Sequence, residues 1–169
     1  FERDNQKPSF FIDKYRLVPL GEWLPAPLNG RFRGLSAVGG VQPGKRSRLL
    51  EWPGPTAGVA ICYELSNGYE LASTVSEGAE WLLSVANLDP YPLLLQKQFL
   101  SLSKLRSIET SRDLLIASNT GPSSLVRPNG EVQELVKPFS EGIALAEVHL
   151  RKEVTNYVRW REYPLFGLF

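Results

Sequence analysis

The sequence predicts an α/β fold in which a mixed β-sheet carries helices. Three short apolar runs, at residues 58–63, 81–86 and 114–117, are typical of strands buried on both faces of a sheet. A segment with helical character separates each run from the next, and this order favours strand–helix–strand units. The chain has 169 residues, 43% hydrophobic and 22% charged, which is the composition of a globular protein near the size of one domain.

The first third of the chain is rich in turn-forming residues, and we expect little regular structure there. An apolar kernel at residues 9–12 predicts a short strand that runs into a loop. Residues 23–55 contain so many prolines and glycines that we expect a long surface loop, and loops of this length are often functional. Lys45, Arg46 and Arg48 form a basic group on this loop, where we expect them to be solvated.

Two helices are predicted between the three buried runs. Residues 69–79 are helix-like and end at a glycine. Residues 93–112 form the clearer case, because apolar side chains recur there at steps of three and four with charged residues between them. The apolar positions of this amphipathic helix are Leu95, Phe99, Leu102, Leu105 and Ile108.

After the third run the sequence predicts further strands. Residues 124–126 and 132–136 flank Asn129-Gly130, a dipeptide that supplies the positive φ angles of a hairpin turn. Residues 143–148 are expected to form one more strand.

Charge and residue counts exclude several classes of function. With 19 Lys and Arg against 18 Asp and Glu the net charge is +1, which excludes a nucleic-acid binder driven by bulk charge. One cysteine and one histidine without ligand spacing make no zinc site, and we expect no cofactor; His149 is predicted to be a surface or capping residue. Residues 39–45 approach a phosphate-binding loop, but Arg46 replaces the required hydroxyl residue.

Cys62 is the first candidate for chemistry, because it ends a buried strand, where α/β folds place reacting groups. A nucleophilic thiol needs a base and a donor for the oxyanion, and the neighbouring Tyr63 and Glu64 offer a hydroxyl and a carboxylate. A lone cysteine in an apolar strand is more often a small buried hydrophobe. Lys14 and Glu22 are, on spacing alone, surface charges. The residues by themselves leave both interpretations open.

Three segments together resemble the carbon-nitrogen hydrolase (nitrilase) superfamily. The lysine segment of that family reads Asp-Lys-Tyr-Arg-Leu at residues 13–17, and its cysteine strand reads Gly-Val-Ala-Ile-Cys-Tyr-Glu at residues 58–64. The third block is Arg-Ser-Ile-Glu at residues 106–109 followed by Asn-Thr-Gly at residues 119–121. Within the superfamily, residues 17–25 resemble the Leu-Val-Pro-Phe-Gly-Glu-Tyr-x-Pro motif of bacterial apolipoprotein N-acyltransferases.

The resemblance implies a fold and a location. The fold is expected to be part of a nitrilase-type αββα sandwich with a mixed β-sheet, and residues 1–169 its C-terminal portion. The chain has no Met, and the general-base glutamate of the family would precede the lysine outside this chain, so we expect a fragment that is inactive alone. Residues 159–169 resemble the approach to a membrane span. The expected location is the periplasmic side of the bacterial inner membrane, held there by missing flanking helices.

The resemblance also implies a chemistry, without a cofactor. Cys62 would take an acyl chain from a phospholipid as a thioester and pass it to the N-terminal amine of an apolipoprotein. Lys14 would stabilise the oxyanion, Glu22 and Glu64 would orient the lysine or the nucleophile loop, and Tyr63 would line the site.

Two alternatives remain open beside this acyltransferase. A soluble amidase of the same superfamily would share the site but act on small amides with water as the acceptor. A non-catalytic remnant would keep the fold as a binding or assembly module. The motif at residues 17–25 and the aromatic end at residues 159–169 favour the acyltransferase.

Overall fold

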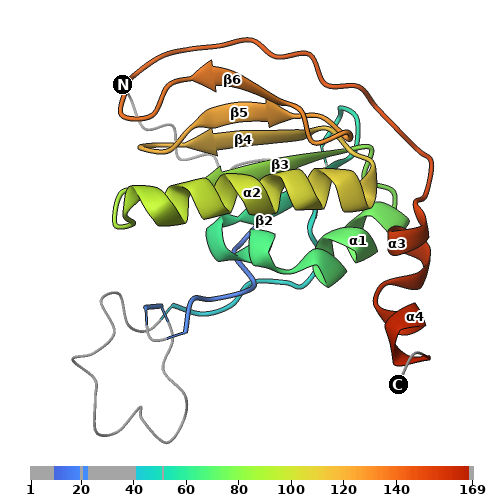
Figure 1. Cartoon of the computed structure of the whole chain (residues 1–169). Coiled ribbons are helices and arrows are strands. Elements are labelled where there is room, and N and C mark those ends of the chain that lie inside the picture. Colours follow the sequence, from blue (N-terminus) through green and yellow to red (C-terminus); the bar gives the residue numbers. More distant parts are fainter. Residues whose placement is uncertain (1–9, 20, 23–40, 51, 168–169) are drawn as a thin grey trace, which may run out of the picture.

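The computed structural model describes residues 10–19, 21–22, 41–50 and 52–167, and Figure 1 shows its architecture. Within these residues one mixed sheet has six strands, which neighbour each other in sequence order. They are β1 (Leu49–Leu50), β2 (Ala57–Ile61), β3 (Trp81–Ala86), β4 (Leu114–Ser118), β5 (Ser123–Val126) and β6 (Val132–Val136).

Strands β2, β3 and β4 run parallel and form the centre of the sheet, while β1, β5 and β6 add to it antiparallel. The register pairs Ile61 with Val85 and Val85 with Ala117, so the carboxyl ends of the three central strands meet at one edge. The predicted mixed sheet and its hairpin are confirmed. The turn of the hairpin contains Gly130, whose φ of 83° is the conformation that favours glycine.

The connections between the parallel strands are helical, as predicted. Helix α1 (Gly68–Ser76) joins β2 to β3, and α2 (Leu93–Thr110) joins β3 to β4. Both lie on the same face of the sheet (Figure 1). A short 3₁₀-helix, η1 (Cys62–Ser66), precedes α1, and α3 (Asn156–Trp160) and α4 (Tyr163–Phe166) follow the sheet.

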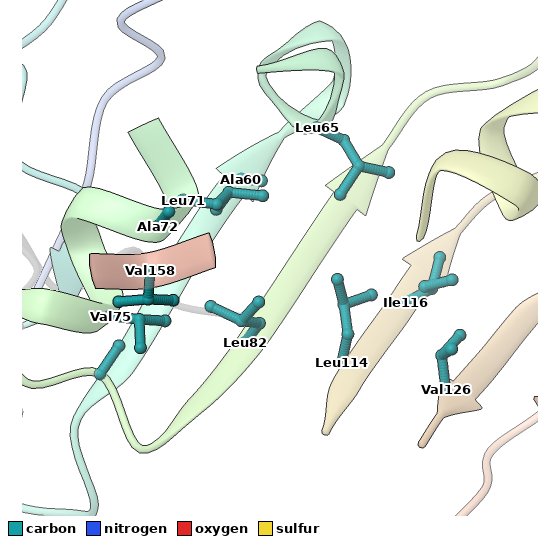
Figure 2. Close-up of a cluster of buried hydrophobic side chains, with 11 residues drawn as sticks. Ala60, Leu65, Leu71, Ala72, Val75, Leu82, Leu114, Ile116, Val126 and Val158 are labelled. Atoms are coloured by element: carbon teal, nitrogen blue, oxygen red, sulfur yellow. The ribbon is translucent and has the colours of Figure 1, made fainter. Parts of the chain in front are cut away.

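The core fills the space between this face of the sheet and the helices (Figure 2). Strand β2 is buried from Ala57 to Ala60, as expected for a strand covered on both sides, whereas β3 and β4 bury only alternate residues. The central members come from the strands, η1, α1 and α3: Ala60, Leu65, Leu71, Ala72, Val75, Leu82, Leu114, Ile116, Val126 and Val158.

Helix α2 forms where predicted but does not bury the predicted apolar stripe. Leu95, Leu105 and Ile108 are 43%, 44% and 50% exposed, and only Phe99 and Leu102 pack against the core. The helix instead turns small and polar side chains toward the rest of the chain: Gln96, Ser103, Arg106, Ser107 and Thr110 are buried. Serine and threonine are accommodated there because their hydroxyls bind backbone carbonyls.

Two predicted strands are absent from the described residues. Residues 10–12 are irregular, and Ser9 lies outside the described part of the chain. Residues 143–148 are extended but unpaired, with Ile143 and Leu145 100% and 97% exposed. The prediction of a strand there is wrong, because among the described residues this segment makes none of the backbone hydrogen bonds to a neighbouring strand that would pair it into the sheet.

The long loop predicted at residues 23–55 is described only in part, since residues 23–40 and 51 lie outside the described ranges. Its described part contains the two-residue strand β1 and is otherwise irregular. None of the described helices has both the length and the apolar character that crossing a bilayer requires.

Candidate active site

Cys62 lies at the point where β2 ends and η1 begins. Its φ of 53° is in the left-handed region, which is costly for a residue with a side chain and which recurs at functional sites. The sequence predicted that the strand would continue to residue 63, but the backbone turns at Cys62 instead. The turn leaves the thiol partly exposed at the edge where β2 and β3 end.

Glu64 holds this turn in place. It is 5% exposed, and one of its carboxylate oxygens accepts a hydrogen bond from Ile61 N at 2.8 Å. The other oxygen accepts from Tyr15 N at 2.6 Å and from Arg16 N at 3.0 Å. One buried carboxylate therefore joins the segment that carries Lys14 to the turn that carries the cysteine.

Lys14 and Glu22 form an ion pair. Lys14 Nζ lies 2.7 Å from each carboxylate oxygen of Glu22, which also accepts a hydrogen bond from Val18 N at 2.8 Å. Burial raises the pKa of Glu22, but the hydrogen bonds from Lys14 and Val18 outweigh it and hold this pKa below 4.5. The spacing in sequence favoured two separate surface charges, whereas the fold pairs them with the lysine side chain only 14% exposed.

One cavity of about 890 Å³ brings these residues together. Lys14, Glu22 and Cys62 all line it, and the ends of β3 and β4, together with the residues that follow these strands, supply most of the remaining wall. Tyr63 and Glu64 are not among its lining residues; the Tyr63 ring packs against Arg16, whose guanidinium carbon lies 5.4 Å from the ring centre. The cavity thus holds a thiol that can act as a nucleophile and an ammonium group, held by a carboxylate, that can stabilise an oxyanion.

Sequence reasoning missed Arg48. It was expected to be solvated on a basic loop, but it is 3% exposed and forms an ion pair with Glu64 at 2.9 Å. The expectation was wrong because the loop folds back onto the turn after β2, where Glu64 supplies a buried partner. Arg46, two residues earlier, does stay at the surface and pairs there with Glu70.

Two asparagines of the cavity wall were also missed. Asn87 follows β3 and Asn119 follows β4, and Asn119 Nδ2 donates to Asn87 Oδ1 at 2.7 Å. Asn119 Oδ1 in turn accepts from Leu88 N at 2.9 Å, so both amides have a defined orientation. A signal for them was present, because Asn87 directly follows the predicted strand at residues 81–86 and Asn119 lies two residues after the predicted strand at residues 114–117.

The opposite end of the parallel strands holds a separate polar cluster. The Asp113 carboxylate is fully buried before β4 and binds Arg127 and the backbone N–H of His149. The His149 side chain is 56% exposed, which fits the surface position predicted for it. Among the described residues no group of three or more His, Cys, Asp or Glu side chains is arranged to hold a metal ion.

A carbon-nitrogen hydrolase sequence profile matches residues 4–155. The chain belongs to the carbon-nitrogen hydrolase family. Apolipoprotein N-acyltransferases of Prochlorococcus marinus (strain MIT 9313) and Parasynechococcus marenigrum are 65% and 58% identical to it, over 99% and 88% of this chain. These matches cover 34% and 32% of the two relatives. The carbon-nitrogen hydrolase chain thus spans about a third of the length of the curated relatives it matches.

Solved structures confirm the nitrilase-type fold. A mutant of the amidase from Nesterenkonia sp. AN1, with acrylamide added at its active site cysteine, superposes with a TM-score of 0.53 and 22% identity. The superposition covers 91% of this chain and 56% of the amidase. The untagged NitN amidase from the same organism gives a TM-score of 0.52 at 20% identity. At these identities the likeness extends to the fold alone.

Proposed function

We propose that this carbon-nitrogen hydrolase chain carries the nucleophile and the oxyanion donor of an apolipoprotein N-acyltransferase. The observation that carries the proposal is the single cavity lined by Cys62, Lys14 and Glu22. The high identity to curated apolipoprotein N-acyltransferases supports this branch of the family over others.

In the first half-reaction Cys62 Sγ attacks the ester carbonyl carbon of a phospholipid. A carbon–sulfur bond forms, the ester C–O bond breaks, and the thiol proton passes through a base to the departing lysophospholipid alcohol. Negative charge develops on the carbonyl oxygen during the attack. The ammonium group of Lys14, held in the cavity wall by Glu22, stabilises this charge.

In the second half-reaction the N-terminal amine of an apolipoprotein attacks the thioester. A nitrogen–carbon bond forms, the carbon–sulfur bond breaks, and the sulfur recovers a proton that the amine loses. Lys14 serves the second oxyanion as it served the first. Glu64 orients the lysine segment and the nucleophile turn, and Tyr63 borders the site beside Arg16.

The proposed setting is the periplasmic face of the bacterial inner membrane, where phospholipid donor and lipoprotein acceptor are both available. In this setting the 169 residues act as the C-terminal portion of the catalytic domain. Residues 159–169 lead toward a membrane span, and flanking helices provide the anchor. The general-base glutamate of the family lies outside this chain, so we expect the 169 residues alone to leave phospholipid unreacted.

Intact-mass measurement tests the proposal. This sequence replaces the matching third of the Prochlorococcus marinus relative, and the purified chimera is incubated with phospholipid micelles beside its Cys62→Ala and Lys14→Ala variants. We expect a mass increase of one acyl chain that is lost with Cys62→Ala and about 10²- to 10³-fold slower with Lys14→Ala, the usual cost of removing an oxyanion donor.

Two other results would refute the proposal. Turnover of small amides without a phospholipid adduct would indicate an amidase. An unmodified protein that binds phospholipid but reacts with neither substrate would indicate a non-catalytic remnant.

A further inference from the structure

We propose that Arg48 is a positioning residue that holds Lys14 in reacting geometry relative to Cys62; the inference rests on the function proposed above. Arg48 and Glu64 form a buried ion pair, 3% and 5% exposed, and neither lines the cavity. Arg48 Nη1 donates to both Glu64 oxygens, at 3.0 and 2.9 Å. Any effect of Arg48 on the reaction must therefore pass through other residues.

The contacts of this pair surround Lys14. On one side Arg48 Nη2 donates to the carbonyl oxygen of Asp13 at 2.8 Å. On the other side Glu64 accepts from Tyr15 N at 2.6 Å. The peptide groups before and after the lysine are thus held by the two halves of one ion pair, so the starting point of the lysine side chain is determined by Arg48 and Glu64 together.

The same pair also reaches the nucleophile. Glu64 accepts from Ile61 N, the residue before Cys62, at 2.8 Å. Arg48 Nη2 donates to the carbonyl oxygen of Lys45 at 2.6 Å, and Gly44 N in that segment donates to the carbonyl oxygen of Lys14 at 2.8 Å. Three stretches of chain that are far apart in sequence therefore meet at Arg48, and the two reacting side chains belong to two of them.

Stability alone does not account for this arrangement. Burying an ion pair costs desolvation that its attraction barely repays, and apolar side chains of similar volume are often as good. The placement of the reacting groups, in contrast, has a large effect, because a displacement of about 1 Å can slow a reaction about 100-fold. The guanidinium also donates in several fixed directions, which suits it to hold Glu64, Asp13 and Lys45 at once; a lysine ammonium lacks this planar fork.

The test uses the acylation half-reaction of the 169-residue chain. At about pH 9 free thiols are largely ionised and lysine ammonium groups largely protonated, so an activated ester needs no general base. Acetylation of Cys62 by p-nitrophenyl acetate is followed by intact mass and nitrophenolate release, and folding by circular dichroism. Arg48→Lys keeps the buried charge, and we expect it to fold normally and to acetylate about 10- to 100-fold more slowly than wild type.

A double-variant cycle separates positioning from structure. If Arg48 acts through Lys14, then Arg48→Lys has no further effect in a Lys14→Met chain. Arg46→Met is the matched control, because this arginine lies two positions away with a side chain 65% exposed, and its rate should equal that of wild type.

Three results would overturn the inference. They are a wild-type rate in Arg48→Lys, a full additional loss in the Lys14→Met background, and unfolding of Arg48→Lys, which would assign the residue to stability. A different result would show that the proposed function fails: the single variant Lys14→Met, with Arg48 unchanged, would be acetylated as fast as wild type. That result would remove the role of Lys14 and the inference with it.

Discussion

At Glu22 the balance between burial and hydrogen bonding favours the ionised carboxylate. Burial is the largest single influence and raises the pKa of Glu22, but the Lys14 ammonium and the Val18 amide together lower it below 4.5. A carboxyl group whose pKa is lower in the folded state stabilises the fold above its unfolded pKa, and the gain disappears as pH falls through the folded value. The Lys14–Glu22 pair should therefore add to stability at neutral pH and lose this effect in acid.

The corresponding prediction concerns Glu22→Gln. Because the Glu22 side chain is 26% exposed, we expect the variant to lower the free energy of unfolding by about 1 kcal/mol or less at pH 7. The difference from wild type should shrink once the pH drops below 4.5 and vanish at the acid end. Urea unfolding between pH 7 and the acid limit measures it, with the exposed Glu141→Gln as control. A difference that grows toward acid would contradict the sign.

Gly68, the first residue of α1, lies close to side chains of α2 and α3. A Cβ atom there would lie 1.7 Å from Arg106 Nη1 and 2.7 Å from the Tyr157 hydroxyl oxygen. Replacing glycine by alanine ordinarily stabilises a helix, but here the added methyl group has no room. An alanine at this position therefore requires the ends of the Arg106 and Tyr157 side chains to shift, and Arg106 is buried and paired with Glu109.

We predict that Gly68→Ala lowers the free energy of unfolding by about 1 to 3 kcal/mol, the range for overpacked positions. Gly142→Ala is the control, because its Cβ would meet Val136 at an ordinary 3.4 Å, and its change should stay within about 0.5 kcal/mol. Thermal or urea denaturation gives both values. Equal stability of Gly68→Ala and wild type would show that Arg106 moves aside without cost.

At the scale of elements, α2 shows that the periodic pattern of apolar residues predicts a helix but not which face of the helix is buried. Its apolar residues repeat as in an amphipathic helix, yet Leu105 and Ile108 are about half exposed while Ser107 and Thr110 are fully buried. Ser107 Oγ donates to the carbonyl oxygens of Arg112 and Val126, which ties the end of the helix to β5. Which face of a helix is buried depends on what its neighbours can bind, and the helix sequence does not contain that information.

The orientation of α2 predicts that a Leu→Gln substitution on its exposed face affects stability much less than the same substitution in the core. Leu105→Gln on α2 should change the free energy of unfolding by no more than about 0.5 kcal/mol, because the side chain is 44% exposed. Leu71→Gln on α1 should cost about 2 kcal/mol or more, because Leu71 is 2% exposed in the core and an amide there lacks partners. Urea titration of both variants compares them. Similar costs at the two positions would mean that Leu105 is buried.

At the scale of the whole molecule, residues 141–155 form an extended connection between the sheet and α3 (Figure 1). Its described backbone contacts lie toward the C-terminal end. His149 N donates to Asp113 at 2.7 Å, Arg151 N donates to the carbonyl oxygen of Glu80 at 3.1 Å, and Arg112 donates to the carbonyl oxygen of Glu153 at 2.8 Å. The first half of the connection therefore lacks the ladder that would make it a strand.

Hydrogen exchange should reveal this division. The amides of residues 143–146 should exchange near the unprotected rate, while those of His149, Arg151 and β4 should be protected. Exchange followed by NMR resolves the individual amides. Protection of residues 143–146 equal to that of β4 would indicate pairing with another strand in solution.

The sequence by itself determined the order of β2, α1, β3, α2, β4 and the β5–β6 hairpin, and the position of Cys62 near the end of β2. These features depend on local patterns, because apolar runs and helical periodicity report burial within one segment. The tertiary structure decided the Lys14–Glu22 pair, the Arg48–Glu64 pair and the buried face of α2. It also decided that residues 143–148 remain unpaired. Ion pairs and strand pairing join residues that are distant in sequence. Whether they form therefore depends on which surfaces folding brings together.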